Sequence, residues 1–329
     1  MNEIKDRKIL IVGVGAVGGY YGAMLVKAGF DVTFLVRGKN YEALEKNGLT
    51  LIDNEKKTIL PVKAIHELPL HKLPPEKTFD YIFICTKGRD TKSAVQNIKH
   101  AVGKNSKVIS FQNGVENIEI IGNIIGNEKV IGGNLYLNSW LIEPGVVEIL
   151  GDYYIKIGEI NKEVESIHEL TLQKIFELSG INCQISPDII ADMWNKLVWN
   201  ASFNPVSVLT GKTVDKMLED KNSYELIKNI MTEVKDVAIA QGINIRPDTV
   251  EFNLNRSKGI INPNAHLSQD FNGFKTSMLQ DFENGKTLEL EELVGVVIRK
   301  AKEKNISVPI IEKTYYQVKE KAASYTYKT

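Results

Sequence analysis

The sequence predicts an α/β fold in two parts. A Rossmann-type doubly wound sheet is expected at residues 1–186, followed by an all-α domain at residues 187–329. Up to about residue 185, apolar β-prone runs alternate with helix-like stretches, a pattern that favours a parallel sheet covered by helices. Beyond Ser186-Pro187-Asp188 only helical periodicity remains. A length of 329 residues allows about two domains.

The composition excludes several classes of function. Lys+Arg and Asp+Glu both number 41, so no general attraction to nucleic acid or to a membrane surface is expected. Residues 1–7 are polar and lack the apolar core of a signal peptide, and no run approaches the ~18 apolar residues of a membrane span. Cys85 and Cys183 lie in apolar stretches, which favours a reducing compartment and predicts a cytoplasmic protein.

A glycine-rich turn follows the first strand, predicted at residues 8–12, and leads into a helix at residues 16–28. It has the pattern G-x-G-x-x-G. We expect Gly13 to permit the tight turn, Gly15 to let the backbone approach a pyrophosphate, and Gly18 to let the helix pack closely on the sheet. The free N–H groups of the helix N-terminus would face the phosphates. The turn therefore predicts a dinucleotide site.

The residue after the second strand predicts which dinucleotide. The strand is expected at residues 31–36, and Arg37 stands 19 residues after Gly18, with Lys39 close behind. NAD sites usually carry a carboxylate about 20 residues beyond the glycines, where it binds the ribose 2′-hydroxyl. A guanidinium instead attracts a 2′-phosphate, so NADP(H) is favoured over a merely solvated arginine.

Two buried strands end in polar residues. They are expected at residues 80–87 and 108–114, so Lys87 and Asn113 lie where doubly wound sheets bind ligands, beyond the carboxyl ends of strands. A loop lysine and a turn-forming Asn-Gly are the alternative interpretations. Earlier in the chain we expect a helix at 41–47, one or two strands within 48–64 and a loop at 68–78.

The rest of the first domain is expected to add a hairpin to the parallel sheet. A β region begins at 130–133, and the turn Pro144-Gly145 precedes hairpin strands at 146–150 and 153–158. A last strand is expected at 181–185. Before it, a helix at 162–179 would bury one face, comprising Val164, Ile167, Leu170, Ile175 and Leu178.

The second domain is expected to be a set of amphipathic helices. They are predicted at 188–208 (kinked near Pro205), 224–241, 288–304 and 310–323, with a frayed tail at 324–329. The stripe of the second of these helices comprises Tyr224, Ile227, Met231, Val234 and Ala238.

One helix face carries polar side chains. Lys196, Asn200 and Asn204 recur every four residues and so share a face. One ammonium and two amides could bind a small anionic, oxygen-rich ligand, although spacing alone also fits a solvated face. The five histidines show no paired spacing, so no metal site is predicted.

The stretch Trp194 to Pro205 resembles the W-x-K-L…N…N-P segment of the ketopantoate reductases (2-dehydropantoate 2-reductases), and the resemblance covers nearly the whole chain. It also includes the glycine turn, Arg37, Thr86-Lys87, Gln112-Asn113-Gly114, Pro144-Gly145, and Ser277-Met278-Leu279-Gln280-Asp281 with Glu289 beyond. It implies NADPH-dependent reduction of 2-dehydropantoate to (R)-pantoate, on the route to pantothenate and coenzyme A.

The resemblance implies roles for individual residues, as follows. The pyrophosphate would be held by Gly13, Val14, Gly15, Ala16, Val17 and Gly18, the 2′-phosphate would be held by Arg37, and the nicotinamide end would lie beside Lys87 and Asn113. The general acid would be Lys196, assisted by Glu289. The substrate oxygens would be bound by Asn113, Asn200, Asn204 and Ser277. Chemistry supports such a lysine, because hydride attack on a 2-keto acid builds negative charge on the carbonyl oxygen. Burial would lower its pKa and a nearby carboxylate would raise it, and the sequence leaves that balance open.

Departures from the family pattern leave alternatives open. Leu288 stands directly before Glu289 where relatives often have threonine, so Glu291 is the competing carboxylate. The segment Asn134 to Ser139 also differs, which allows a paralogue that acts on another small 2-oxo or 3-hydroxy acid. A non-catalytic NADP(H)-binding sensor is the alternative of another class. The apolar helix faces are extensive enough to form a homodimer interface in the helical domain, or they could all be internal core.

Overall fold

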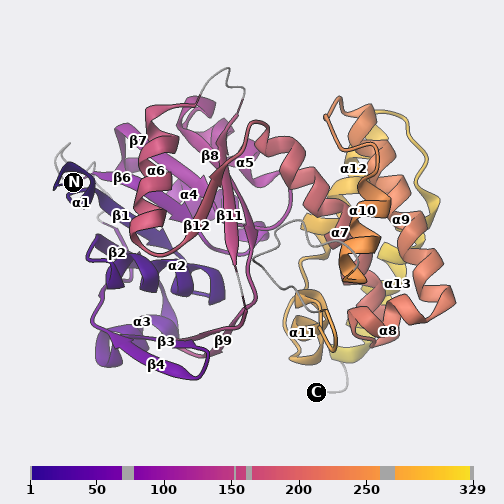
Figure 1. The fold of residues 1–329 in the computed structure, drawn as a ribbon, viewed down its shortest axis with the longest axis horizontal. Helices are drawn as coiled ribbons and strands as arrows, with labels where there is room; N and C mark the ends of the chain where they lie inside the picture. The colour runs from indigo at the N-terminus through magenta and orange to yellow at the C-terminus, as the bar shows by residue number, and fades with distance from the viewer. Residues whose placement is uncertain (1, 69–77, 152, 161–164, 260–270, 327–329) are drawn as a thin grey trace. The chain divides into compact units, whose positions relative to one another are not determined.

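The computed structural model describes residues 2–68, 78–151, 153–160, 165–259 and 271–326 (Figure 1). The chain divides into two compact units. The sheet unit comprises residues 1–113 and 117–189, and the helical unit comprises residues 114–116 and 190–329. Within the described ranges no helix is long and apolar enough to cross a membrane. The predicted fold class, a mixed α/β part followed by a helical part, is confirmed.

An eight-stranded sheet forms the centre of the sheet unit, in the order β12-β11-β8-β7-β6-β1-β2-β5. The neighbouring strands β8, β7, β6, β1, β2 and β5 are all parallel. Strand β11 is antiparallel to β8, and β12 is parallel to β11. The bounds are β1 (Lys8–Val12), β2 (Asp31–Leu35), β5 (Lys63–Ile65), β6 (Phe79–Ile84), β7 (Val102–Ser110), β8 (Val130–Tyr136), β11 (Tyr154–Glu159) and β12 (Asn182–Ile185). The apolar runs of β1 and β6 are buried, as a sheet covered on both faces requires.

A second, four-stranded sheet corrects the predicted hairpin. Its order is β4 (Lys56–Leu60), β3 (Leu49–Asp53), β10 (Val146–Ile149) and β9 (Ser139–Glu143). Gly145, at φ +76°, turns the chain from β9 into β10, so the hairpin partner of β10 precedes Pro144-Gly145. The prediction that 146–150 and 153–158 pair with each other is therefore wrong, because β10 and β11 belong to different sheets.

Helix α2 (Ala16–Lys27, Figure 1) contacts strands of both sheets, and glycines allow the close approach. A Cβ on Gly22 would lie 2.2 Å from the Phe34 ring on β2. A Cβ on Gly19 would lie 2.4 Å from Val147 on β10 of the small sheet. Three glycines in one helix normally cost stability, about 1 kcal/mol each relative to alanine. Here two of them allow both sheets to approach the same helix.

The remaining helices of the sheet unit are α1 (Asn2–Lys5), α3 (Gly38–Asn47), α4 (Thr91–Ile98), α5 (Asn117–Ile125) and α6 (Ile167–Leu178). The predicted apolar face of the last helix is wrong in part. Ile167 and Leu170 are exposed, and the buried face runs through Leu172 and Ile175. The helix also starts later than predicted, because Ser166 and Glu169 form a capping box before Ile167. Val164 of the predicted stripe lies outside the described residues.

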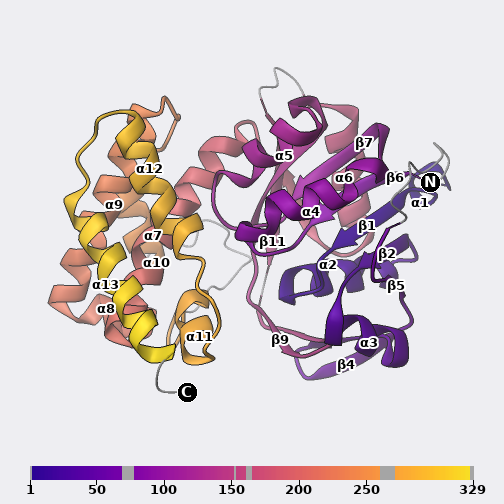
Figure 2. The ribbon, with the colours of Figure 1, turned by 180° about the vertical axis from the view of Figure 1, so that it is seen from behind.

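The helical unit consists of α7 (Ile189–Thr210), α8 (Val214–Glu219), α9 (Lys221–Ala240), α10 (Thr249–Ser257), α11 (Ser277–Glu283), a π-helical segment (Glu291–Gly295), α12 (Val296–Glu303) and α13 (Pro309–Thr326) (Figure 2). The predicted stripe of α9 is buried apart from Tyr224, which is half-buried. The Glu233 carboxylate accepts hydrogen bonds from the N–H groups of Ile310 and Ile311, which fixes the start of α13. Residues 324–326, expected to fray, continue this helix.

Candidate active site

The glycine turn between β1 and α2 has the geometry expected of a phosphate cradle. Gly13 has φ +92°, and its N–H donates to the carbonyl oxygen of Leu35 at 3.0 Å. A Cβ on Gly18 would lie 2.1 Å from the carbonyl oxygen of Gly13, so only glycine allows the helix to begin this close to the turn. A Cβ on Gly15 would meet nothing within 4 Å. The backbone at Gly15 is thus accessible from one side.

The N-terminus of α2 suits a negatively charged ligand. Its N-cap is Gly15, which has no side chain to bind the first N–H groups, and no acidic residue stands in the first turn. Uncapped N–H groups and the positive end of the helix dipole favour phosphate. The residues present therefore fit the pyrophosphate of a dinucleotide.

Two cationic side chains follow β2. Arg37 is exposed and is the N-cap residue of α3, and Lys39 is exposed two residues later. The Oδ1 atom of Asn40 is buried without a hydrogen-bond partner. The end of β2 therefore presents positive charge, as a site for a phosphorylated ribose requires.

Buried polar contacts hold together the loops that follow β6 and β7. The Gln112 side-chain amide donates to the carbonyl oxygen of Thr86 at 3.0 Å and to Thr91 Oγ1 at 2.7 Å. Thr91 Oγ1 lies 2.8 Å from Asn117 Oδ1 and 2.7 Å from the carbonyl oxygen of Gly88. The two loops carry Lys87, which is half-buried, and Asn113. Three buried polar side chains thus fix the backbone beside both predicted site residues.

Lys196 lies on α7, at the N-terminal end of the polar face predicted from its spacing. Its pKa is lowered from 10.5 to about 8, first by burial and next by the positive charge of Arg256, while the charge of Glu289 acts in the opposite direction. The effect of desolvation on the lysine pKa therefore outweighs the opposing effect of the Glu289 carboxylate. A lysine with this pKa exchanges its proton near neutral pH.

The amides on the same face are buried. Asn200 is 7% exposed and Asn204 is 1% exposed. The Oδ1 atom of Asn204 is buried without a hydrogen-bond partner, an arrangement that costs about 1–3 kcal/mol unless a ligand satisfies it. Trp199 stacks on Phe203 and donates its indole N–H to Ser257 on α10, which fixes the adjacent helix against α7.

Ser277 is exposed and begins α11, a helix that is absent from the predicted elements. The preceding Thr276 is its buried N-cap, and Thr276 Oγ1 accepts from the N–H of Leu279 at 3.2 Å. Thr276 Oγ1 also lies 2.6 Å from Ser207 Oγ on α7. This contact ties the start of α11 to the helix that carries Lys196.

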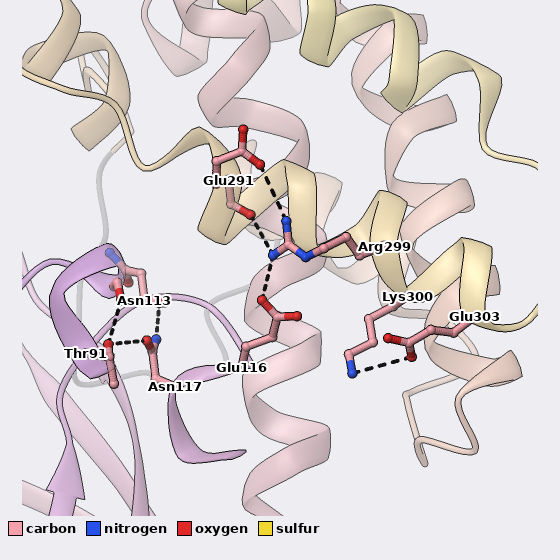
Figure 3. Close-up of polar contacts among 9 residues, drawn as sticks. Thr91, Asn113, Glu116, Asn117, Glu291, Arg299, Lys300 and Glu303 are labelled. Atoms are coloured by element: carbon pink, nitrogen blue, oxygen red, sulfur yellow. Dashed lines mark hydrogen bonds and ion pairs between the residues drawn. The ribbon is translucent and has the colours of Figure 1, made fainter. Parts of the chain in front are cut away.

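The two candidate carboxylates have different surroundings. Glu289 is 7% exposed, and its charge acts on Lys196. Glu291 is exposed, accepts a hydrogen bond from the Tyr315 hydroxyl and pairs with Arg299, its Oε2 lying 3.5 Å from Nη1 (Figure 3). The structure therefore associates Glu289, and not Glu291, with the lysine.

Some residues near the candidate site were not predicted from the sequence. Arg256 lies on α10, a helix with no strong periodic signal, so nothing in its spacing connected it with Lys196. Thr91 and Asn117 lie on helices that were not predicted. In the part of the chain that the structure describes, no group of His, Cys, Asp and Glu could hold a metal ion. Both cysteines are free thiols, and burial raises the pKa of Cys183 to about 12.

Comparison with known proteins finds family matches to both parts of the chain. The family described as "Ketopantoate reductase PanE/ApbA" matches residues 9–162, and "Ketopantoate reductase PanE/ApbA C terminal" matches residues 188–322. The 2-dehydropantoate 2-reductase of Mesorhizobium japonicum is 30% identical over 312 residues, which cover 88% of this chain and 90% of that protein.

Two solved structures share the fold. The structure of 2-dehydropantoate 2-reductase from Geobacter metallireducens GS-15 has a TM-score of 0.83 at 30% identity, covering 95% of this chain and 99% of the other. D-mandelate dehydrogenase with NADH and anilino(oxo)acetate has a TM-score of 0.86 at 21% identity, covering 97% and 99%, and shows the fold alone.

A Rossmann-type sheet with a glycine turn, joined to a helical unit with a partly buried lysine, defines an oxidoreductase. The family matches then specify which one: the chain belongs to the ketopantoate reductase family.

Proposed function

We propose that this protein reduces a small 2-keto acid with NADPH, and that the acid is 2-dehydropantoate, which becomes (R)-pantoate on the route to pantothenate and coenzyme A. The proposal assigns NADP binding to residues 1–186 and substrate binding and proton transfer to residues 187–329. The observation that carries it is Lys196, whose pKa of about 8 lies near the working range of a general acid.

The sheet unit supports the choice of cofactor. Gly13 to Gly18 form a turn with accessible backbone at Gly15, and the uncapped helix behind it suits a pyrophosphate. Exposed Arg37 would pair with the 2′-phosphate of NADP(H), with Lys87 and Asn113 along the nicotinamide half. When bound, NADPH supplies the hydride that the keto carbon receives.

The helical unit supports the proton chemistry. Lys196 would donate a hydrogen bond to the keto oxygen, stabilise the negative charge that develops there and then give up its proton. Asn200, Asn204 and Ser277 would bind the other substrate oxygens, and the unsatisfied Asn204 Oδ1 would accept from a substrate hydroxyl. Glu289 keeps the lysine pKa from falling further, so that the ammonium is populated at neutral pH.

Steady-state kinetics with NADPH and a panel of 2-keto acids tests the proposal. We expect 2-dehydropantoate to give the highest kcat/KM. Turnover of another acid with none of 2-dehydropantoate would identify the paralogous reductase. The altered segment Asn134 to Ser139, whose Asn134 is buried in β8, favours that second candidate. Tight NADPH binding without turnover of any acid would identify a sensor.

A further inference from the structure

Three residues leave the sheet unit and belong to the helical unit. Residues 114–116 group with the helices, whereas residues 113 and 117 on either side group with the sheet. Val115 packs against the buried core of the helical unit. Glu116 Oε2 lies 2.6 Å from Arg299 Nη2 on α12 (Figure 3). Apolar packing of Val115 and the Glu116–Arg299 ion pair therefore both hold the excursion.

The base of this excursion is closed within the sheet unit. Asn117 Nδ2 donates to the carbonyl oxygen of Asn113 at 2.8 Å, and Asn117 Oδ1 lies 2.8 Å from Thr91 Oγ1 (Figure 3). Gly114, at φ +94°, turns the chain directly after Asn113. Residues 113–117 thus form a short loop that is closed at its base by the Asn117 side chain.

Arg299 is held in place from its other side by the π-helical segment. Its Nη2 atom donates to the carbonyl oxygen of Glu291 at 3.3 Å, and Nη1 lies 3.5 Å from Glu291 Oε2. Gly295 makes room for this pair, since a Cβ there would lie 2.5 Å from Glu291 Oε2 and 3.1 Å from Arg299 Nη1. The guanidinium therefore bridges two carboxylates from separate segments, which restricts its rotamers.

We propose that Arg299 is a positioning residue, which pairs with Glu116, fixes the closed loop 113–117 and thereby sets the position of Asn113. This inference rests on the proposed function, in which Asn113 contacts cofactor and substrate. The polar contacts of Arg299 are with Glu116 and Glu291, so its effect on Asn113 is indirect. The pair is partly exposed, with 46% of the arginine and 29% of the glutamate side chain accessible, so a modest effect is expected.

The test compares Arg299→Gln, Glu116→Gln and the double variant. Each single change lowers kcat/KM for the keto acid by about threefold to fivefold, the range that partly exposed ion pairs allow. The double variant is no worse than either single variant, since both remove the same contact. Arg299→Lys keeps the charge but not the planar fork and restores part of the activity. Glu303→Gln is the control, because it breaks the Lys300–Glu303 pair on the same helix and leaves the loop untouched (Figure 3).

Two further readouts do not require turnover. Hydrogen exchange at the amides of residues 113–117 becomes faster, and the Kd for NADPH rises, in the Arg299 and Glu116 variants but not in Glu303→Gln. Unchanged exchange in that loop, or faster exchange with unchanged Kd and kcat/KM, overturns the inference. If the unmodified protein reduces no keto acid, the proposed function fails, and exchange with NADPH affinity still decides the role of Arg299.

Discussion

Replacing Lys196 by methionine should lower kcat and raise the free energy of unfolding. Methionine has a similar length and no charge, so the variant loses the general acid but keeps most of the packing. Removing acid–base catalysis lowers kcat by on the order of 10²–10⁴. The Kd for NADPH should change little, because the lysine is assigned to the substrate and not to the cofactor.

The stability gain follows from the lowered pKa. A fall from 10.5 to about 8 corresponds to a cost of roughly 3 kcal/mol for keeping the folded lysine charged. The unfolded chain binds more protons than the folded one between pH 8 and 10.5, so wild-type stability rises over that interval. The methionine variant should therefore be more stable by about 1–3 kcal/mol at pH 7, and this advantage should disappear as the pH approaches 10.5.

Two assays check this reasoning. Urea unfolding at pH 7 and at pH 9.5 can be followed by tryptophan fluorescence, to which Trp194 and Trp199 contribute from the helical unit and Trp140 from the sheet unit. The wild-type kcat/KM for reduction should be flat below pH 7 and fall through about pH 8, as the ammonium is lost. A wild type more stable than the variant at pH 7 refutes the lowered pKa of Lys196. A kcat/KM that does not change up to pH 9.5 refutes its role as the general acid.

Three further changes give distinct results. Glu289→Gln removes the charge that raises the Lys196 pKa, so the fall in kcat/KM should move to lower pH, whereas Glu291→Gln should leave it in place; equal shifts would contradict the assignment of Glu289. Arg37→Asp should lower the preference for NADPH over NADH by about 100-fold in kcat/KM, and an unchanged preference would remove Arg37 from the 2′-phosphate site. Gly18→Ala should lower the free energy of unfolding by about 1–3 kcal/mol, because the new Cβ meets the Gly13 carbonyl. In Gly15→Ala the new Cβ has no atom within 4 Å, so this variant should keep the wild-type free energy of unfolding and bind NADPH more weakly. Similar melting curves for the two variants would show that the turn tolerates both.

The sequence was most informative where local physics decides the outcome. The glycine turn after residues 8–12, the buried strands at β6 and β7, and the polar spacing of Lys196, Asn200 and Asn204 each follow from composition and periodicity within a few residues. Asn200 and Asn204 are buried on α7, so the alternative of a solvated face does not apply to these two amides.

Long-range pairing decided the features that the sequence analysis missed. Whether β10 pairs with β9 or β11 depends on which neighbour the pleat and the Gly145 turn place beside it, and alternation alone cannot distinguish them. Short helices such as α8 and α11 have too few turns to show periodicity. The effect of Arg256 on Lys196 arises from tertiary packing, which no spacing rule predicts.

The two sheets on either side of α2 have a consequence for cooperativity. A four-stranded sheet with Ile59 and Ile142 exposed buries little apolar surface on its own. It rests on α2 where Gly19 meets Val147, and the large sheet rests on the same helix where Gly22 meets Phe34. Leu51 and Val147 of the small sheet belong to the same buried cluster as Phe34 of the large sheet, so separating either sheet from α2 would expose part of this shared core. The sheet unit should therefore melt as one cooperative body, and any ligand that stabilises the first turn of α2 stabilises both sheets at once.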